Sequence, residues 1–218
     1  MSRGRLIVLE GVDGAGTSTQ AALLTEALSS LDYPCLATRE PSDGPVGVLI
    51  RQVLTHRLVV PAGNRPPRME TMALLFAADR VDHLECEILP NLKDGITVVC
   101  DRYLHSSIAY QTLTSSDDEA TALEWVATIN SKAMIPDLVM VLDVPPGEAA
   151  RRRSHRGGAE QVYEDDELQA RLATFYTELQ ARFPAHPIAR VDGSRSIEAV
   201  HAECLALALN LLKGDQSC

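Results

Sequence analysis

The stretch Gly11-Val12-Asp13-Gly14-Ala15-Gly16-Thr17-Ser18-Thr19 stands between an apolar run, Leu6–Leu9, and a segment whose apolar side chains recur at helical spacing. The order is therefore strand, glycine-rich turn, helix, which is the context of a phosphate-binding loop. Glycines let the backbone approach an anion closely, and the N–H groups at a helix start hold that anion. The stretch predicts a nucleotide phosphate site.

One residue departs from the usual phosphate-loop pattern. Thr17 stands where a lysine normally contacts the phosphates, whereas Ser18 keeps the hydroxyl that ligates Mg²⁺. Without the lysine, the glycine pattern is also compatible with a tight turn that binds nothing. The flanking strand and helix favour the phosphate site, as do the polar residues farther along the chain.

Length and composition predict one soluble domain. The chain has 218 residues, of which 45% are hydrophobic, 4% aromatic and 23% charged. No apolar run suggests a membrane span. Because residues 1–5 lead straight into the first strand, we expect no signal peptide and a cytoplasmic location. The five cysteines include no CxxC pair and are expected to be reduced thiols.

The charge of the chain limits its partners. A net charge of −10 argues against generic binding of nucleic acids, which requires a basic surface. The three lysines, Lys93, Lys132 and Lys213, lie outside the glycine loop and the other motifs. Anionic ligands are therefore expected to meet arginines, whose planar fork of donors suits phosphate oxygens.

Apolar runs alternate with helical patterns along the whole chain. This alternation predicts an α/β fold in which helices cover both faces of a parallel sheet. The expected strands are Leu6–Leu9, Cys35–Thr38, Thr97–Cys100, Leu138–Leu142 and Ile188–Val191. The expected helices include Glu70–Leu89, a helix after Ser106 that contains Ala109 and Tyr110, Glu119–Asn130, Asp166–Phe183 and Ile197–Leu212.

Two further features complete the expected organisation. Within the helix Glu70–Leu89, the expected core stripe is Leu74, Ala77, Val81, Leu84 and Ile88. The run Arg151–Arg156 and the following pair Gly157-Gly158 suggest a charged, mobile connection. We expect a single domain over residues 1–213, with a lid at about 151–164 and a tail at 214–218.

Polar residues follow four of the expected strands. Asp13, Arg39 and Asp101-Arg102 come shortly after the first three strands, and the arginine run follows the fourth. Ligands of parallel sheets collect beyond the carboxyl ends of the strands, so these residues are expected to meet there. Arg102 can neutralise a phosphate, and Asp101 is placed for Mg²⁺ or a bound water. A plain salt pair between them is the alternative.

Several other residues have both a functional and a structural interpretation. Phe76 and Arg80 lie four apart on one helix and suit a nucleobase, since an aromatic face stacks a base and a guanidinium donates to its carbonyl. The more common interpretation of such a pair is a core Phe beside a solvated Arg. Four residues downstream also have a more common structural interpretation, as packing residues, surface residues or helix caps. These residues are Ser106, Ser107, Tyr110 and Gln111.

Taken together, these segments resemble the bacterial thymidylate kinases over nearly the whole chain. The matching strings are Glu10–Gly16, Arg39-Glu40-Pro41, Phe76–Arg80, Asp101-Arg102-Tyr103 with Ser106-Ser107 and Ala109-Tyr110-Gln111, Leu142–Pro146, and Tyr163-Glu164. The resemblance implies a P-loop NTPase fold with a five-stranded parallel sheet and a short arginine-rich lid. It also implies a homodimer that transfers the γ-phosphoryl group of MgATP to dTMP and yields dTDP.

The resemblance further implies a role for each matched residue. Residues 11–19 would bind ATP together with Arg152, while Ser18 and Asp101 would hold Mg²⁺. Asp13, Arg102, Arg152 and Arg156 would serve catalysis, with Asp13 near the acceptor sugar and phosphate. Phe76 would stack on thymine, Arg80 would meet its exocyclic oxygen, and Tyr110 would crowd the sugar 2′ position. The remaining acceptor-site residues would be Arg39, Arg51, Ser106, Ser107, Gln111, Tyr163 and Glu164, with Arg39, Arg51 and Arg102 around the phosphate.

The chain departs from the family pattern at two places. Thr17 replaces the loop lysine, and Ser42-Asp43-Gly44 replaces a Gly-Gly-Thr. Loss of one preorganised donor costs about 2.7–4 kcal/mol in other enzymes, so we expect a lid arginine, Arg152, Arg153 or Arg156, to offset it. The alternatives are an inactive or weak nucleotide-binding relative and a related nucleoside or nucleotide kinase with another acceptor.

Overall fold

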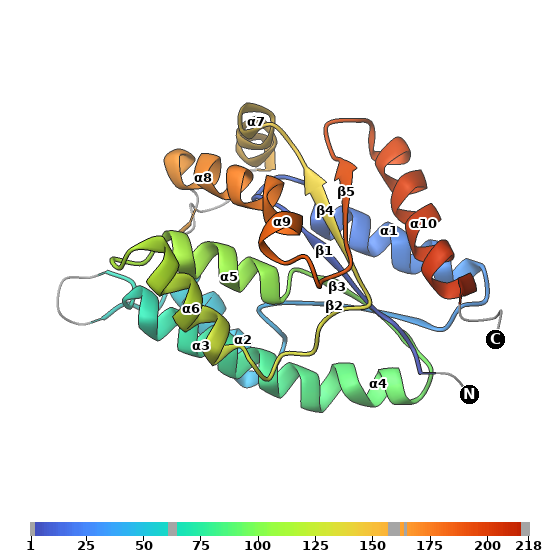
Figure 1. The fold of residues 1–218 in the computed structure, drawn as a ribbon, viewed down its shortest axis with the longest axis horizontal. Coiled ribbons are helices and arrows are strands. Elements are labelled where there is room, and N and C mark those ends of the chain that lie inside the picture. The colour runs from blue at the N-terminus through green and yellow to red at the C-terminus, as the bar shows by residue number, and fades with distance from the viewer. Residues whose placement is uncertain (1–2, 61–64, 157–161, 164, 215–218) are drawn as a thin grey trace.

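The computed structural model describes residues 3–60, 65–156, 162–163 and 165–214. Five parallel strands form one sheet in the order β2-β3-β1-β4-β5. The predicted α/β class, strand number and parallel arrangement are confirmed, and the topology is that of a P-loop NTPase fold (Figure 1). The strands are β1 (Leu6–Glu10), β2 (Cys35–Arg39), β3 (Thr97–Asp101), β4 (Leu138–Asp143) and β5 (Ile188–Asp192).

Each strand runs one residue farther than its apolar pattern predicted. Hydrophobicity stops at the polar residue, but backbone pairing continues through it, since Arg39 pairs with Asp101 and Asp143 pairs with Asp192. The polar residues at the strand ends are therefore held in register by the sheet. This register fixes the position of the carboxyl edge at which ligands of such sheets bind.

Helices cover both faces of the sheet. The helices α1 and α10 pack together on one face, and α3, α5 and α8 lie on the other (Figure 1). The helical segments are α1 (Thr17–Ser30), α2 (Pro45–Leu54), α3 (Met69–His83), the π-helical η1 (Leu84–Ile88), α4 (Leu89–Lys93), α5 (Leu104–Leu113), α6 (Glu119–Ile129), α7 (Pro146–Arg156), α8 (Asp166–Thr177), α9 (Leu179–Arg182) and α10 (Ile197–Gly214).

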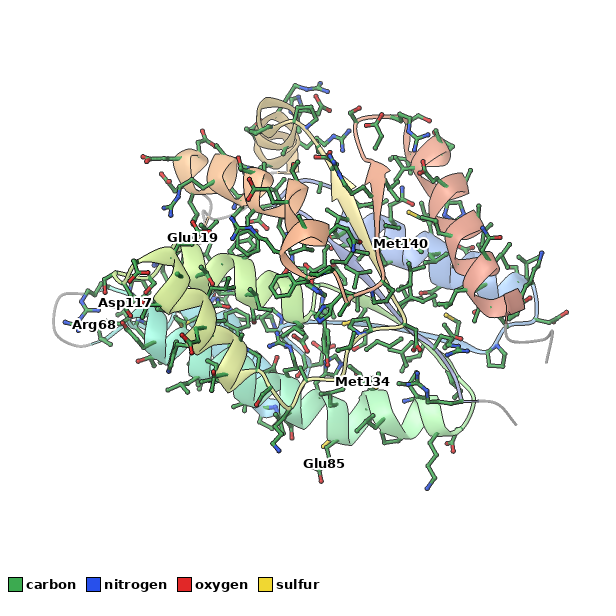
Figure 2. The ribbon with its side chains drawn as sticks, in the orientation of Figure 1. Arg68, Glu85, Asp117, Glu119, Met134 and Met140 are labelled. Carbon is green, nitrogen blue, oxygen red and sulfur yellow. The ribbon has the colours of Figure 1, made fainter. Side chains whose placement is uncertain are left out.

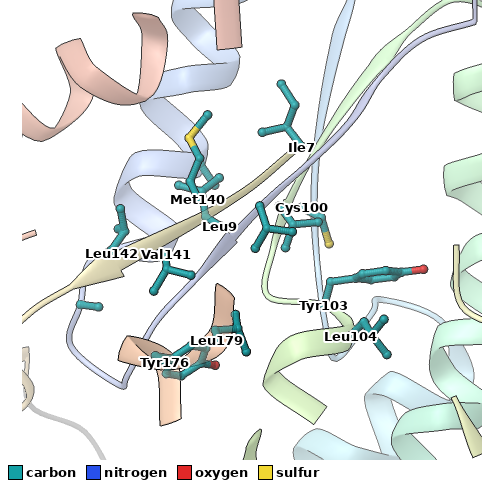
Figure 3. Packing of buried hydrophobic residues seen from close by; sticks show 14 of the residues in the cluster. Ile7, Leu9, Cys100, Tyr103, Leu104, Met140, Val141, Leu142, Tyr176 and Leu179 are labelled. Carbon is teal, nitrogen blue, oxygen red and sulfur yellow. The ribbon is translucent and has the colours of Figure 1, made fainter. Parts of the chain in front are cut away.

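The hydrophobic core lies between the sheet and these helix layers. Side chains fill the interior around Met140, whereas Glu85 lies at the outer edge (Figure 2). Along β4 the side chains alternate, with Met140 on the α1 side of the sheet and Val141 on the side of Tyr176 (Figure 3). β1 is buried along its whole length, so the loop that follows it starts from a fixed support.

Two expectations need correction, and one helix was missed. Leu74 and Val81 do not belong to the core stripe of α3, because they are 53% and 45% exposed. The buried face of α3 instead carries Met72 and several polar residues. The run Arg151–Arg156 is not a mobile connection but the end of the helix α7. The pair Gly157-Gly158 lies outside the described residues, and the helix α2 was not predicted.

Candidate active site

The phosphate loop turns from β1 into α1 through glycines in the left-handed region. Gly14 has φ 91° and Gly16 has φ 97°, conformations that favour glycine. Gly16 caps α1, and its lack of a side chain means that no side-chain acceptor occupies the first amides of the helix. These amides and the helix dipole can hold an anion.

Gly14 is also the point at which the loop contacts α7. A Cβ atom at Gly14 would lie 2.5 Å from the carbonyl oxygen of Ala149 and 3.1 Å from Cγ of Arg153. Any side chain at this position would therefore collide with the α7 backbone. Arg153 of α7 brings a positive charge to this part of the loop.

Ser18 and Asp101 meet as the sequence predicted. The Ser18 hydroxyl donates a hydrogen bond to Oδ2 of Asp101, while Oδ1 of Asp101 is buried without a partner among the described residues. Hydroxyl and carboxylate oxygens are ligands that Mg²⁺ prefers, and Mg²⁺ usually keeps phosphate and water ligands besides. Within the described chain no cluster of three or more His, Cys, Asp or Glu forms a metal site. The pair therefore fits a Mg²⁺ ion that a nucleotide brings with it.

Asp13 and Arg102 form a charge-assisted pair at the start of the loop. Nη2 of Arg102 donates to Oδ1 of Asp13 at 2.7 Å, and Nη1 donates to the Gly11 carbonyl at 2.8 Å. Arg102 adopts φ 65°, a left-handed conformation that is strained for a bulky residue and that turns its side chain back over the loop. The guanidinium also lies over the Tyr110 ring, 5.5 Å from its centroid.

A buried glutamate that the sequence analysis did not select supports this arrangement. Glu10 is fully buried, and its Oε1 accepts hydrogen bonds from the backbone amides of Tyr103 (3.0 Å) and Ser106 (3.1 Å). Its Oε2 accepts from the Ser106 hydroxyl at 2.5 Å and from the Tyr176 hydroxyl at 3.1 Å. Burial raises the pKa of Glu10, although these donors oppose the shift. Glu10 thereby holds the start of α5 against the end of β1.

The more common interpretation of Arg80 as a solvated residue is wrong, because Arg80 is only 1% exposed. One Nη atom donates to Asn130, and the other donates to Glu40 at 2.6 Å and to the Ser107 hydroxyl at 2.8 Å. Nε is buried without a hydrogen-bond partner in the described chain. Arg80 is therefore a fixed wall of the cavity, held by residues from three other segments.

Arg39 and Arg51 share a carboxylate. Nη2 of Arg39 donates to Oδ1 of Asp43 at 2.9 Å, and Nη2 of Arg51 donates to the same oxygen at 3.0 Å. The hydrogen bond from Arg39, with the positive charges of Arg39 and Arg51, lowers the pKa of Asp43, which is 75% exposed. Arg51 also donates to the carbonyls of Pro41 (2.7 Å) and Ser42 (2.5 Å). Both arginines thus already hold an oxyanion of the chain itself.

The arginines of α7 point in different directions. Arg152 lines the cavity, donating from Nε to Glu148 at 2.8 Å and from Nη1 to the Gly193 carbonyl at 2.9 Å. Arg153 turns instead to the phosphate loop and donates to the Asp13 carbonyl at 3.0 Å. The side chain of Arg156 lies outside the described part of the structure.

Most of the predicted residues line one cavity of about 700 Å³. Gly11, Val12 and Arg51 do not line it, and Glu164 lies outside the described residues. The predicted residues that line the cavity are Asp13, Gly14, Ala15, Gly16, Thr17, Ser18, Thr19, Arg39, Phe76, Arg80, Asp101, Arg102, Ser106, Ser107, Tyr110, Gln111, Arg152 and Tyr163.

The sequence analysis missed one wall of this cavity. Gln20 from α1, Gly193, Arg195 and Ser196 between β5 and α10, and Ile197 at the start of α10 also line it. Gln20 is buried and donates to the Ile197 carbonyl at 3.0 Å, which ties the two segments together. Gln20 followed the loop motif directly and could have been selected, whereas nothing local marks residues 193–197.

Comparisons with known proteins agree on one family. The model of the thymidylate kinase family matches residues 9–204. The "Probable thymidylate kinase" of Pyrococcus horikoshii is 41% identical over 212 residues, covering 97% of this chain and 99% of that protein. The thymidylate kinase of Pelotomaculum thermopropionicum is 39% identical, covering 96% and 95%.

A solved structure supports the fold. The thymidylate kinase from Candida albicans superposes with a TM-score of 0.78, covering 96% of this chain and 93% of that chain. Its sequence identity is 24%, so this likeness concerns the fold. The P-loop NTPase architecture therefore extends over nearly the whole length of both chains.

Proposed function

Since this chain belongs to the thymidylate kinase family, we propose that the cavity of about 700 Å³ binds ATP along the phosphate loop and dTMP between α3 and α5. The reaction is the ATP-dependent phosphorylation of dTMP to dTDP. The observation that carries the arrangement is that the loop amides, the Ser18–Asp101 pair and the Phe76–Arg80 pair all face one cavity. Neither the inactive relative nor another acceptor is favoured by the family match.

On the donor side, the amides of residues 13–18 hold the phosphates of ATP. The adenosine lies toward Arg152, Gly193 and Arg195, which line the cavity on the side of the phosphate loop. Ser18 and Asp101 hold Mg²⁺, which when bound neutralises charge on the phosphate oxygens. Phosphoryl transfer needs positioning and positive charge more than covalent help from the protein.

On the acceptor side, Phe76 stacks on thymine and Arg80 donates to its exocyclic oxygen. Tyr110 lies beneath the sugar, where burial raises the pKa of its hydroxyl and keeps that group neutral. Asp13 and Arg102 stand between the two nucleotides, with Asp13 toward the acceptor sugar and phosphate. Arg39 and Arg51 bind the acceptor phosphate in place of Asp43.

Arginines of α7 supply positive charge in place of the missing loop lysine. Arg152 faces the cavity and Arg153 is fixed to the loop backbone, so both bring positive charge to the place where a lysine would act. The substitution Thr17→Lys tests this idea. We expect kcat to rise less than about a hundredfold, since one preorganised donor is worth about 10²–10³ and the arginines supply part of it. A rise of many hundredfold would mean that they supply little.

A homodimer explains the exposed apolar face of α3. Leu74 and Val81 lie seven residues apart on this helix and are about half exposed. A second copy of the chain would cover them. Sedimentation analysis of the chain and of the Leu74→Glu, Val81→Glu variant tests the dimer, which the double variant should lose. Among the described residues, no helix combines the length and apolar character that a membrane span requires. The cytoplasmic location stays a prediction.

Measuring ADP formation from MgATP with a panel of acceptors, and dTDP formation with dTMP, tests the proposed function. The panel contains dTMP, dUMP, dCMP, dGMP and thymidine. We expect dTMP to have the highest kcat/KM, because Phe76, Arg80 and Tyr110 suit a thymine deoxynucleotide. Binding of ATP without any dTDP formation would select the inactive relative, and preference for another acceptor would select the related kinase.

A further inference from the structure

Gln169 of α8 is 2% exposed and lies directly against Asp13. Its Oε1 accepts a hydrogen bond from the Asp13 backbone amide at 3.0 Å, and its Nε2 donates to Oδ2 of Asp13 at 2.9 Å. Nε2 also donates to the Tyr163 carbonyl at 2.7 Å. Both N–H groups of the amide and its oxygen are therefore engaged, which fixes the orientation of the side chain.

The two oxygens of the Asp13 carboxylate are held from two different elements. Arg102, at the end of β3, binds Oδ1, and Gln169 binds Oδ2. The carboxylate can therefore neither rotate nor swing away without breaking a buried hydrogen bond. The Tyr163 carbonyl links the same amide to the segment that precedes α8.

We propose that Gln169 is a positioning residue for phosphoryl transfer. It holds the Asp13 carboxylate in the orientation that faces the acceptor, and its hydrogen bond to the Tyr163 carbonyl keeps its own amide in place. This inference rests on the proposed role of Asp13. Gln169 itself lies outside the residues that line the cavity, so it acts through Asp13.

The charged and titratable groups around Asp13 define a sharp test. Arg102 and Tyr110 face it from the β3–α5 side, and Arg153 from α7 binds its carbonyl. Gln169 is the neutral donor of this set. In Gln169→Glu the new carboxylate would face Oδ2 of Asp13, and two carboxylates at such a distance cannot both be ionised without repulsion. A shared proton would restore the contact at low pH.

The experiment measures kcat/KM for dTMP between pH 6 and pH 9 for the unmodified chain and for Gln169→Glu. We expect the variant to lose at least about tenfold at pH 9 and to recover to within about threefold at pH 6. The KM for ATP should change less than about twofold. Gln180→Glu, the same chemical change at an exposed position of α9, should follow the unmodified chain at every pH.

Two further variants distinguish a failure of the positioning role of Gln169 from a failure of the proposed role of Asp13. Gln169→Asn, which shortens the side chain without adding charge, should lower kcat/KM about tenfold equally at all pH values, a size typical of residues that orient a functional side chain. An unchanged profile in Gln169→Glu, or an equal loss at every pH, would overturn the positioning role. Full activity of Asp13→Asn would instead overturn the proposed role of Asp13.

Discussion

Four arginines predicted for the acceptor side fall into two groups that differ in burial. Arg80 and Arg102 are surrounded by fixed partners, including the buried carboxylate of Glu40 and the half-buried carboxylate of Asp13. Arg39 and Arg51 are more exposed and share the carboxylate of Asp43 on a surface loop. The first group is held by partners within the fold, whereas in the proposed function the second group would exchange a carboxylate for a phosphate.

This difference has an energetic cause. A buried charge without its partner is costly, so the Arg80 and Arg102 networks keep their geometry whether or not a ligand is bound. An exposed ion pair is worth little, so Asp43 can be displaced at small cost. In the proposed function, the site would therefore combine a rigid wall for the base and sugar with an adaptable end for the acceptor phosphate.

The largest effect is expected from the buried group. Arg80→Met removes the arginine that pairs with Glu40 at 2.6 Å and leaves this buried carboxylate with only the longer contact to His83, at 3.4 Å. We expect the free energy of unfolding to fall by about 3–5 kcal/mol, measured by denaturant titration. Adding Glu40→Gln should recover part of the loss. Arg190→Met, which removes an exposed partner of Asp143, should cost less than about 1 kcal/mol; equal costs for both arginines would break the comparison.

A pH effect of intermediate size is expected from the same buried region. His105 is buried beside His186, and burial lowers its pKa to about 3, with His186 and Arg80 adding to the shift. In the unfolded chain a histidine has a pKa of about 6.5. Between these two values the unfolded state binds the extra proton, so the free energy of unfolding falls as pH falls, by up to about 1.4 kcal/mol per pH unit.

Unfolding titrations of His105→Gln between pH 7 and pH 4 check this effect. The variant should lose most of the pH dependence of the free energy of unfolding, because glutamine takes up no proton between pH 7 and pH 4. His155→Gln, the same change at an exposed position of α7, should keep it. If His105→Gln retained the full slope, the buried region would owe its pH dependence to another group.

The smallest effect is expected from the exposed group. Asp43→Asn weakens the internal partner of Arg39 and Arg51 and so removes a competitor of the acceptor phosphate. An exposed pair is worth about 0.2–1 kcal/mol, so the KM for dTMP should fall by up to about fivefold. Asp94→Asn makes the same charge change at an exposed position after α4 and should have no effect. A raised KM in Asp43→Asn would show that Asp43 supports the arginines.

Much of the fold could be predicted because its signals are local. Apolar runs marked all five strands, and the glycine loop marked the turn into α1. The core stripe of α3 was wrong, since periodicity cannot distinguish an apolar face in the core from one at the surface. Leu74 and Val81 follow the helical spacing but lie on the exposed face.

The site was predicted less completely because some of its contacts are distant in sequence. Asp13, Asp101 and Arg102 could be selected, since each follows a strand and the sheet brings the strand ends together. Gln169 carries no local signal, because its partner Asp13 lies 156 residues away and only the packing of α8 joins them. Glu10 stood inside a matched motif, but its role depends on amides of α5.

A crystal structure with dTMP bound tests the contrast between the two arginine groups most directly. We predict that the acceptor phosphate separates Asp43 from Arg39 and Arg51, while the Arg102–Asp13 distance stays near 2.7 Å and Arg80 keeps Glu40 within hydrogen-bonding distance. A complex in which Asp43 stays bound to both arginines while the Arg102–Asp13 pair opens would contradict this account.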